Sequence, residues 1–229
     1  MFILSDSRIP KSAKEKLSEY GEVIPFSTEG ITYESISGHP DIFFCQVNGQ
    51  LIVAPNLPDK YKNILSKNAI SFIQGEMPVE NKYPGTSRYN IVATDKYLIH
   101  NFRYTDSVIT DAGDDLELIH SGQGYTRCSL LSLRNNCFIT SDLGINRVLN
   151  GFRLETFYIE PDNIILPGMK HGFFGGACGI FENKVFIIGK LSSLKNGVAL
   201  QKYFNNLDYQ IIELYDGLLF DGGSIFFIY

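Results

Sequence analysis

The feature of this 229-residue sequence that most constrains its fold is an internal repeat. Five times a glycine-containing turn leads into an apolar run: "GHPDIFFCQ", "GTSRYNIVA", "GYTRCSLLS", "GFFGGACGIF" and "DGGSIFFIY". The runs recur on average about every 46 residues, a period typical of folds that repeat one supersecondary unit. Aligning them gives one equivalent residue in each run, called here the anchor residues: Asp41, Asn90, Cys128, Gly176 and Ser224.

The segments after these runs also repeat. A short polar turn such as "VNGQ" or "ENK" leads to a second apolar strand, and polar pairs of this kind between apolar runs indicate a hairpin. A helical or irregular stretch and a third strand complete the unit, which is therefore predicted to be β-β-α-β. The second strands are expected within 51–56, 97–102, 137–142 and 185–190, the helices within 58–68, 103–113, 146–152 and 196–206, and the third strands within 69–76, 115–122, 154–161 and 209–217.

The fifth unit is divided between the two ends of the sequence. The final run has no second strand after it, whereas "MFILSD" (1–6) looks like a second strand with no first strand before it, and "FILSD" resembles "FITSD" of another repeat. A helix in 10–21 and a strand in 22–28 then complete this unit. We therefore predict that the final strand pairs with the first and closes a ring, which would leave no free sheet edges between repeats. The alternative is an ordinary α+β domain in which the regular spacing of the apolar runs is coincidental.

Five β-β-α-β units split in this way resemble the pentein fold of the guanidino-group-modifying enzymes, the arginine deiminases, dimethylarginine dimethylaminohydrolases and amidinotransferases. The ending "DGGSIFFIY" resembles the Asp-Gly-Gly ending of those enzymes. The sequence also resembles a clostridial-type family of that superfamily through "GHPDIFF", "QGYTRCSLL", "GFFGGACG" and "DGGSI". The resemblance covers the whole chain and implies one α/β domain over residues 1–229, a pseudo-fivefold α/β propeller.

The resemblance does not transfer the catalytic set of those enzymes. Their nucleophilic cysteine follows the paired glycines on the final strand, where this chain has Ser224 and no cysteine. Their general-base histidine would fall in "YTRCSLL", where this chain has Arg127 and Cys128. An acidic partner is also not evident in "PGTSRYN". Deiminase activity therefore cannot simply be assigned from the fold.

Polar residues nevertheless gather where a pentein brings its repeats together. A thiolate nucleophile needs a nearby cation or base, so Cys128, His39 and Asp41 are the candidate catalytic residues. Carboxylates suit a guanidinium or ammonium ligand. The candidate substrate-binding residues are Asn90, Arg127, Tyr125, Asp221, Ser224 and His171.

Each of these candidates also has a structural interpretation. Cys128 can be a small buried residue, as Cys45 and Cys137 are expected to be. His39 before Pro40 can be a turn residue. Asp221 before two glycines can cap backbone amides in a tight turn.

The composition also indicates which partners, cofactors and cellular compartment to expect. A net charge of -5 with no basic block argues against a nucleic-acid partner. The four cysteines do not have zinc-site spacing, and no cofactor motif is present, so neither a metal nor a cofactor is expected. No signal peptide or membrane-length apolar run is evident, so a cytoplasmic protein with free thiols is expected, and the oligomeric state stays open.

Two hypotheses remain. The first is a cysteine-dependent hydrolase or transferase acting on a small guanidine, amidine or amide. In it Cys128 is the nucleophile, His39 moves protons, and Asp41 or Asp221 holds the cationic substrate. The second is a non-catalytic pentein that binds a small molecule or a protein, as a ribosome anti-association factor of this fold does. Whether the chain is an enzyme is left open by the sequence.

Overall fold

The computed structural model describes residues 1–229 and contains five three-stranded sheets with one topology. In each, the middle strand pairs antiparallel with one neighbour and parallel with the other. A helix connects the two parallel strands, as a parallel pair requires. The predicted β-β-α-β unit is therefore present five times.

Most of the repeated elements lie within the predicted ranges, with shorter strands. The first strands are β3 (Phe44–Val47), β6 (Val92–Ala93), β9 (Leu130–Ser132), β13 (Cys178–Phe181) and β17 (Phe226–Ile228). The second strands are β4 (Gln50–Val53), β7 (Tyr97–His100), β10 (Phe138–Thr140), β14 (Lys184–Ile187) and β1 (Phe2–Asp6). The helices are α2 (Asp59–Lys67), α3 (Ser107–Ala112), α5 (Leu143–Gly151), α6 (Gly197–Asn206) and α1 (Lys11–Leu17). The third strands are β5 (Ile73–Gln74), β8 (Glu117–His120), β11 (Thr156–Tyr158), β15 (Gln210–Glu213) and β2 (Glu22–Phe26). The exceptions are α5, which begins three residues before its predicted range, and β4 and β14, which begin one residue before theirs.

Local sequence explains how these units form. The hairpin from β3 to β4 turns through Asn48 (φ 49°) and Gly49 (φ 74°), and two positive φ angles are what a twisted two-residue hairpin turn requires. Helix α5 begins where the Asp142 side chain accepts a hydrogen bond from the Ile145 amide. Its buried residues Ile145 and Leu149 are four positions apart, so one face of the helix packs onto the sheet.

The two ends of the chain pair with each other, as predicted. Strand β1 is antiparallel to β17, with Phe2 opposite Ile228 and Leu4 opposite Phe226. The six sheets remain separate, and no sheet closes on itself. The end-to-end pairing is thus confirmed, whereas closure of the units into a fivefold propeller stays a prediction.

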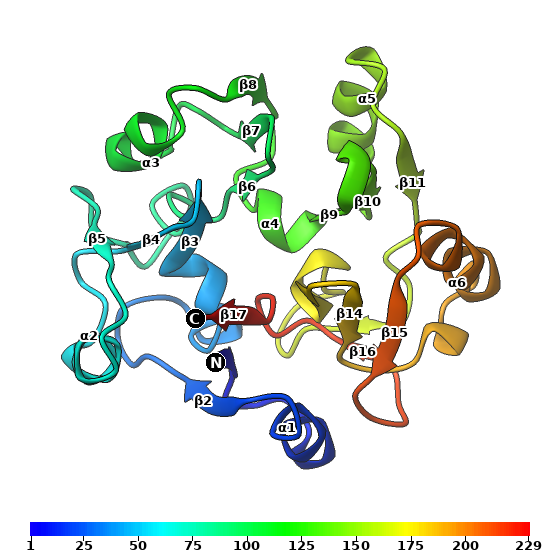
Figure 1. Ribbon diagram of the computed structural model, residues 1–229, viewed down its shortest axis with the longest axis horizontal. Helices are drawn as coiled ribbons and strands as arrows, with labels where there is room; N and C mark the ends of the chain where they lie inside the picture. The colour runs from blue at the N-terminus through cyan, green and yellow to red at the C-terminus, as the bar shows by residue number, and fades with distance from the viewer.

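Figure 1 shows the five units arranged around the middle of the molecule, with α1, α2, α3, α5 and α6 on the outside and β17 near the centre. The core consists of separate hydrophobic clusters, the largest of which joins Phe26 and Phe44 to Phe226 of the final strand. Among the helices, none combines the length and apolar character needed to cross a membrane.

A sixth sheet was not predicted. It pairs β12 (Ile164–Ile165) with β16 (Leu219–Phe220) in parallel. The Asp221 amide, directly after β16, donates to the Ile165 carbonyl at 2.8 Å. This small sheet brings the segment after β12 against the final Asp-Gly-Gly turn.

Candidate functional site

The five anchor residues meet in the middle of the molecule, although they do not lie on strands. Three of them belong to short helical turns: Asp41 to η2 (Pro40–Ile42), Cys128 to α4 (Thr126–Ser129) and Gly176 to η4 (Gly175–Ala177). The sequence predicted that a strand starts at each anchor residue. In the structure, each first strand begins two or three residues after its anchor residue. Side-chain alternation along a strand therefore does not apply to Arg127 and Cys128, or to His39 and Asp41.

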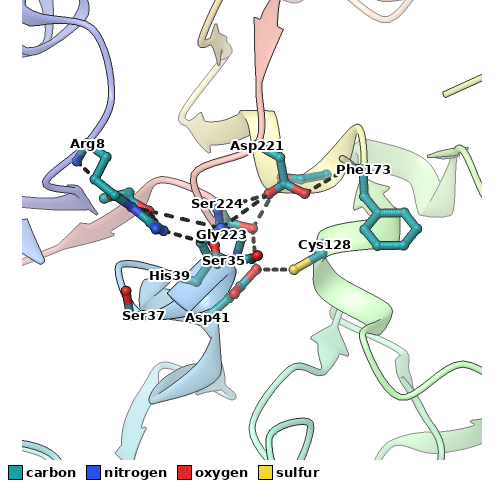
Figure 2. Close-up of polar contacts among 12 residues, drawn as sticks. Arg8, Ser35, Ser37, His39, Asp41, Cys128, Phe173, Asp221, Gly223 and Ser224 are labelled. Atoms are coloured by element: carbon teal, nitrogen blue, oxygen red, sulfur yellow. Dashed lines mark hydrogen bonds and ion pairs between the residues drawn. The ribbon is translucent and has the colours of Figure 1, made fainter. Parts of the chain in front are cut away.

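Hydrogen bonds connect the anchor residues directly. The Cys128 Sγ donates to Asp41 Oδ2 at 2.9 Å, and the Ser224 hydroxyl donates to the same oxygen at 3.1 Å. Asn90 donates from Nδ2 to Cys128 Sγ at 3.3 Å and accepts from the Cys128 amide at 3.2 Å. The Ser224 amide donates to the Gly176 carbonyl at 2.8 Å. Figure 2 shows the sulfur of Cys128 directed at the Asp41 carboxylate.

His39 is buried beside this network. Its Nε2 lies 4.0 Å from a carboxylate oxygen of Asp6 and 3.9 Å from one of Asp221. Neither ring nitrogen has a hydrogen-bond partner. One ring nitrogen, a carboxylate oxygen of Asp41 and the sulfur of Cys128 all lie within 4.8 Å of one another. The predicted group of Cys128, His39 and Asp41 is thus brought together, although no hydrogen bond joins His39 to Asp41.

Asp221 is held by backbone amides, as the structural interpretation of the Asp-Gly-Gly turn expected. Its Oδ1 accepts from the Gly223 amide at 3.1 Å and its Oδ2 from the Phe173 amide at 2.8 Å. Gly176 is required beside it, because a Cβ there would lie 1.9 Å from Asp221 Oδ1. Burial raises the pKa of this carboxyl group, and His39 and the amide bonds oppose that shift.

A cavity of about 220 Å³, called here the first cavity, adjoins Cys128, His39 and Asp221. Tyr125 and His171, two further predicted site residues, also line it. The remaining lining is mainly apolar and aromatic: Tyr33, Ile36, Leu166, Met169, Lys170 and Phe173. The Tyr33 and Tyr125 hydroxyls are 3.0 Å apart. A mainly apolar cavity with a few convergent polar groups is the usual form of a small-molecule site.

The other predicted residues lie elsewhere. Arg127 and Ser224 line a second cavity of about 200 Å³, which shares no lining residue with the first. The Arg127 guanidinium carbon stacks 4.0 Å from the centre of the Phe226 ring. Asn90 and Asp41 are fully buried and line neither cavity. Both residues contact Cys128 on the side away from the first cavity. Asp41 therefore does not reach the cavity that Asp221 lines.

The surroundings of Cys128 favour the protonated thiol over the thiolate. Burial, the Asp41 and Asp221 carboxylates and the hydrogen bond to Asp41 raise its pKa well above the usual value. Burial also raises the pKa of Cys45 and Cys178. Cys128 differs from both in its carboxylate partner, and it lines the first cavity, whereas Cys178 lines the second cavity and Cys45 lines neither.

Sequence reasoning missed Asp6, Tyr33 and Phe173. Asp6 is fully buried beside His39 and is paired with Arg8, whose Nη2 lies 2.7 Å from its Oδ2. The match between "FILSD" and "FITSD" was the available signal, because it aligns Asp6 with the helix cap Asp142. Tyr33 and the Phe173 amide carry no signal, since their positions depend on loops that only the folded chain brings inward.

A comparison with protein families shows to which family this chain belongs. Residues 4–226 match a family described as a family of unknown function (DUF6873). The chain belongs to this family. A search of curated proteins finds no match to it.

Solved structures similar to this member of DUF6873 are guanidino-modifying enzymes. They include an agmatine deiminase from C. jejuni (TM-score 0.57, 10% identity, 93% of this chain and 86% of that chain). They also include the amidinotransferase SxtG of Microseira wollei, from the saxitoxin biosynthetic pathway (TM-score 0.57, 10% identity, 93% and 87%). A third is DDAH from Pseudomonas aeruginosa in complex with citrulline (TM-score 0.53, 10% identity, 93% and 91%). At this identity the likeness shows the fold alone, and that fold is the expected pentein type of mixed α/β structure. A clostridial-type origin of the family stays a prediction.

Proposed function

We propose that this chain is a single pentein domain, a pseudo-fivefold propeller closed by its end strands, that acts as a cysteine-dependent hydrolase or transferase. Its substrate is a small guanidine, amidine or amide. One observation carries the proposal: Cys128 donates to the Asp41 carboxylate at 2.9 Å and lines the same cavity as His39 and Asp221. The fold neighbours include an agmatine deiminase and an amidinotransferase, which supports this substrate class.

The first cavity suits a small planar cation. Asp221 supplies one buried carboxylate on its wall, and Tyr33, Tyr125 and Phe173 supply aromatic surface. A guanidinium or amidinium group pairs with a carboxylate and stacks on aromatic rings. Burial raises the pKa of Asp221 because it disfavours the charged carboxylate, and a bound cation would offset that cost. In this proposal Asp221 holds the substrate, and Tyr125 and His171 border it.

Cys128 and His39 are then the reacting groups. As Sγ attacks the amidino carbon, the thiol proton passes by way of His39, which lines the same cavity, to the leaving nitrogen. The S–C bond forms, the C–N bond breaks, and the amine departs with that proton. Water in a hydrolase, or an acceptor amine in a transferase, then cleaves the S–C bond and returns a proton to sulfur. Asn90 and Asp41 position the thiol through their hydrogen bonds to it.

The site differs from that implied for the enzymes of this fold, because no cysteine follows the final glycines. Ser224 stands there, and both its hydroxyl and the Cys128 thiol donate to Asp41 Oδ2. The proposal is that Cys128, on the unit where those enzymes keep a histidine, takes over the nucleophile's part.

A second function is favoured by a different observation. The raised pKa of Cys128 leaves it a thiol at neutral pH, which suits a non-catalytic pentein that binds a small molecule or a protein partner. In that case the first cavity is a ligand site, and Asp221 matters for affinity while Cys128 does not.

Amine release from a panel of small guanidines, amidines and amides tests the choice. We expect turnover that Cys128→Ala reduces to background, while Cys178→Ala, at the buried thiol of the second cavity, keeps it. Iodoacetamide labelling followed by mass spectrometry should modify Cys128 faster than Cys45 or Cys137. Equal labelling rates together with no loss in Cys128→Ala would exclude the enzyme and leave the binding module.

A further inference from the structure

Three buried side chains offer metal-ligating atoms at one place. A ring nitrogen of His39, a carboxylate oxygen of Asp41 and the sulfur of Cys128 lie within 4.8 Å of one another. They come from η2 and its preceding residue and from α4, two short turns that the fold packs together in the middle of the molecule. The repeat predicts that these residues meet, although Cys128 lies 87 positions from Asp41, but the sequence indicates no metal site.

These atoms are also left without the partners that buried polar groups normally have. His39 is 1% exposed and neither of its ring nitrogens makes a hydrogen bond, and Asp41 Oδ1 has none either. Buried polar atoms are satisfied in most proteins, so an orphaned set points to a water or ion that belongs there. The orphaned atoms lie on two of the three candidate ligands.

Three carboxylates lie around the group against two guanidinium groups, those of Arg8 and Arg127, so the balance of charge favours a cation. Asp41, Asp6 and Asp221 are buried within reach of His39 or Cys128. Arg8 neutralises Asp6 through hydrogen bonds from Nε and Nη2 to both its carboxylate oxygens. Asp221 has no Lys or Arg in ion-pair contact: its one such contact is His39, while Asp41 and Cys128 also lie close enough to act on it electrostatically. A bound divalent cation would compensate this negative charge.

We infer that His39, Asp41 and Cys128 form a binding site for one divalent cation of borderline softness, with Zn²⁺ the best fit. One imidazole, one carboxylate and one thiolate are a ligand set that zinc accepts and that Mg²⁺ and Ca²⁺ do not. A tetrahedral zinc ion needs its ligand atoms roughly 3.3–3.8 Å apart, so side-chain movements of about 1 Å complete the site. His39 and Cys128 line the first cavity, so the fourth coordination position opens toward it.

Binding displaces the thiol proton: Cys-SH and Zn²⁺ give a zinc-bound thiolate and one released proton. The bound ion occupies the sulfur that the proposed reaction uses. Zinc therefore protects Cys128 from alkylation and inhibits turnover where turnover exists. The inference itself rests on the three ligands and does not depend on the proposed reaction.

Titration with ZnCl₂ against a chelating indicator, and with CoCl₂ followed by absorption spectroscopy, tests the site. We expect one equivalent of either metal, with a near-ultraviolet thiolate-to-cobalt charge-transfer band and the intense visible bands of tetrahedral cobalt. Cys128→Ser should abolish the charge-transfer band, and His39→Gln should weaken Zn²⁺ binding by at least about 100-fold, more than the loss of an outer partner costs. Cys178→Ser is the matched control and should bind as the wild type does.

The wild type alone can overturn the inference. No Zn²⁺ binding up to millimolar concentration, or cobalt binding without a charge-transfer band, would exclude the site even if a variant failed to fold. Unchanged Zn²⁺ affinity in Cys128→Ser would do the same. Because these readouts need no substrate, a protein that binds zinc but turns over no guanidine would refute the proposed reaction and leave the metal site standing.

Discussion

The two cavities beside the anchor residues have similar volumes, about 220 and about 200 Å³, but opposite electrostatic character. The first contains the buried carboxylate of Asp221 with Cys128 and His39. The second contains the guanidinium of Arg127, which makes no ion pair and rests on Phe226. Burial lowers the pKa of Arg127, and the field of Asp41 opposes that shift. The first cavity is therefore suited to a cation and the second is not.

Two adjacent residues of α4 create this difference. Successive side chains of a helix point about 100° apart, so Arg127 and Cys128 in one helical turn enter different cavities. On a strand they would also have pointed apart, to opposite faces, so the turn sets which cavity each side chain enters rather than whether the two are separated. The comparison teaches that a short turn at the centre of this fold can decide which of two sites each of two neighbouring residues enters.

The largest expected effect comes from filling the space beside Asp221. Gly176→Ala places a Cβ 1.9 Å from Asp221 Oδ1. Overpacking of a buried site costs about 1–3 kcal/mol, and displaced amide bonds add to it, so we expect a loss of roughly 3–6 kcal/mol in the free energy of unfolding. Urea denaturation measures it. Gly122→Ala, where a Cβ meets nothing within 4 Å, is the control and should cost under about 1 kcal/mol. Equal losses of unfolding free energy in the two variants would show that the space beside Asp221 is not tightly packed.

The next effect concerns the loop that leads into α4. His100 is fully buried, its Nε2 lies 2.7 Å from the Gly124 carbonyl, and burial lowers its pKa to about 4. Between about pH 6.5 and 4 the unfolded chain binds a proton that the folded chain does not, so stability falls as pH falls through this window. One such group contributes about 2 kcal/mol of loss between pH 7 and 5.

Urea denaturation at the two pH values should show that loss reduced in His100→Gln and kept in His120→Gln, at the exposed histidine. Because the loop carries Tyr125, labelling of Cys128 in the first cavity should also rise more at pH 5 than labelling of Cys178, once intrinsic thiol reactivity is corrected for. A pH dependence that is unchanged in His100→Gln would contradict this role.

The smallest expected effect separates the two cavities by ligand affinity. Asp221→Asn removes the carboxylate from the first cavity and should weaken binding of methylguanidine about tenfold or more, because a charge-assisted pair becomes a neutral one. Arg127→Met keeps the packing on Phe226 and should leave that affinity within about twofold. Isothermal titration calorimetry measures both. Equal weakening in the two variants would mean that the cavities do not differ as described.

Much of the architecture was predictable because it repeats. Hairpin turns, apolar strands and amphipathic helices are local signals, and finding them five times made the pairing of β1 with β17 predictable across the whole chain. The anchor alignment also placed Asp41, Asn90, Cys128 and Ser224 in one cluster, and the structure joins them by hydrogen bonds. Periodicity carries this information because equivalent positions occupy equivalent places in the units.

The site itself was less predictable where it depends on single departures from the repeat. The helical turns at Asp41 and Cys128 changed which way each side chain points, and the unpredicted pairing of β12 with β16 brought Phe173 and His171 beside Asp221. No local pattern encodes these contacts, because they join segments far apart in the sequence.

The sequence by itself determined the five units, their order and the residues at their centre. Those properties follow from local propensity and from repetition, which a linear pattern records. Only the tertiary structure decided that Cys128 faces one cavity and Arg127 another, that Asp41 lies behind the site while Asp221 lines it, and that Asp6 accompanies His39. These properties depend on where each side chain points and how deeply it is buried. The chemistry of a side chain depends on which atoms the folded chain places within a few ångströms of it.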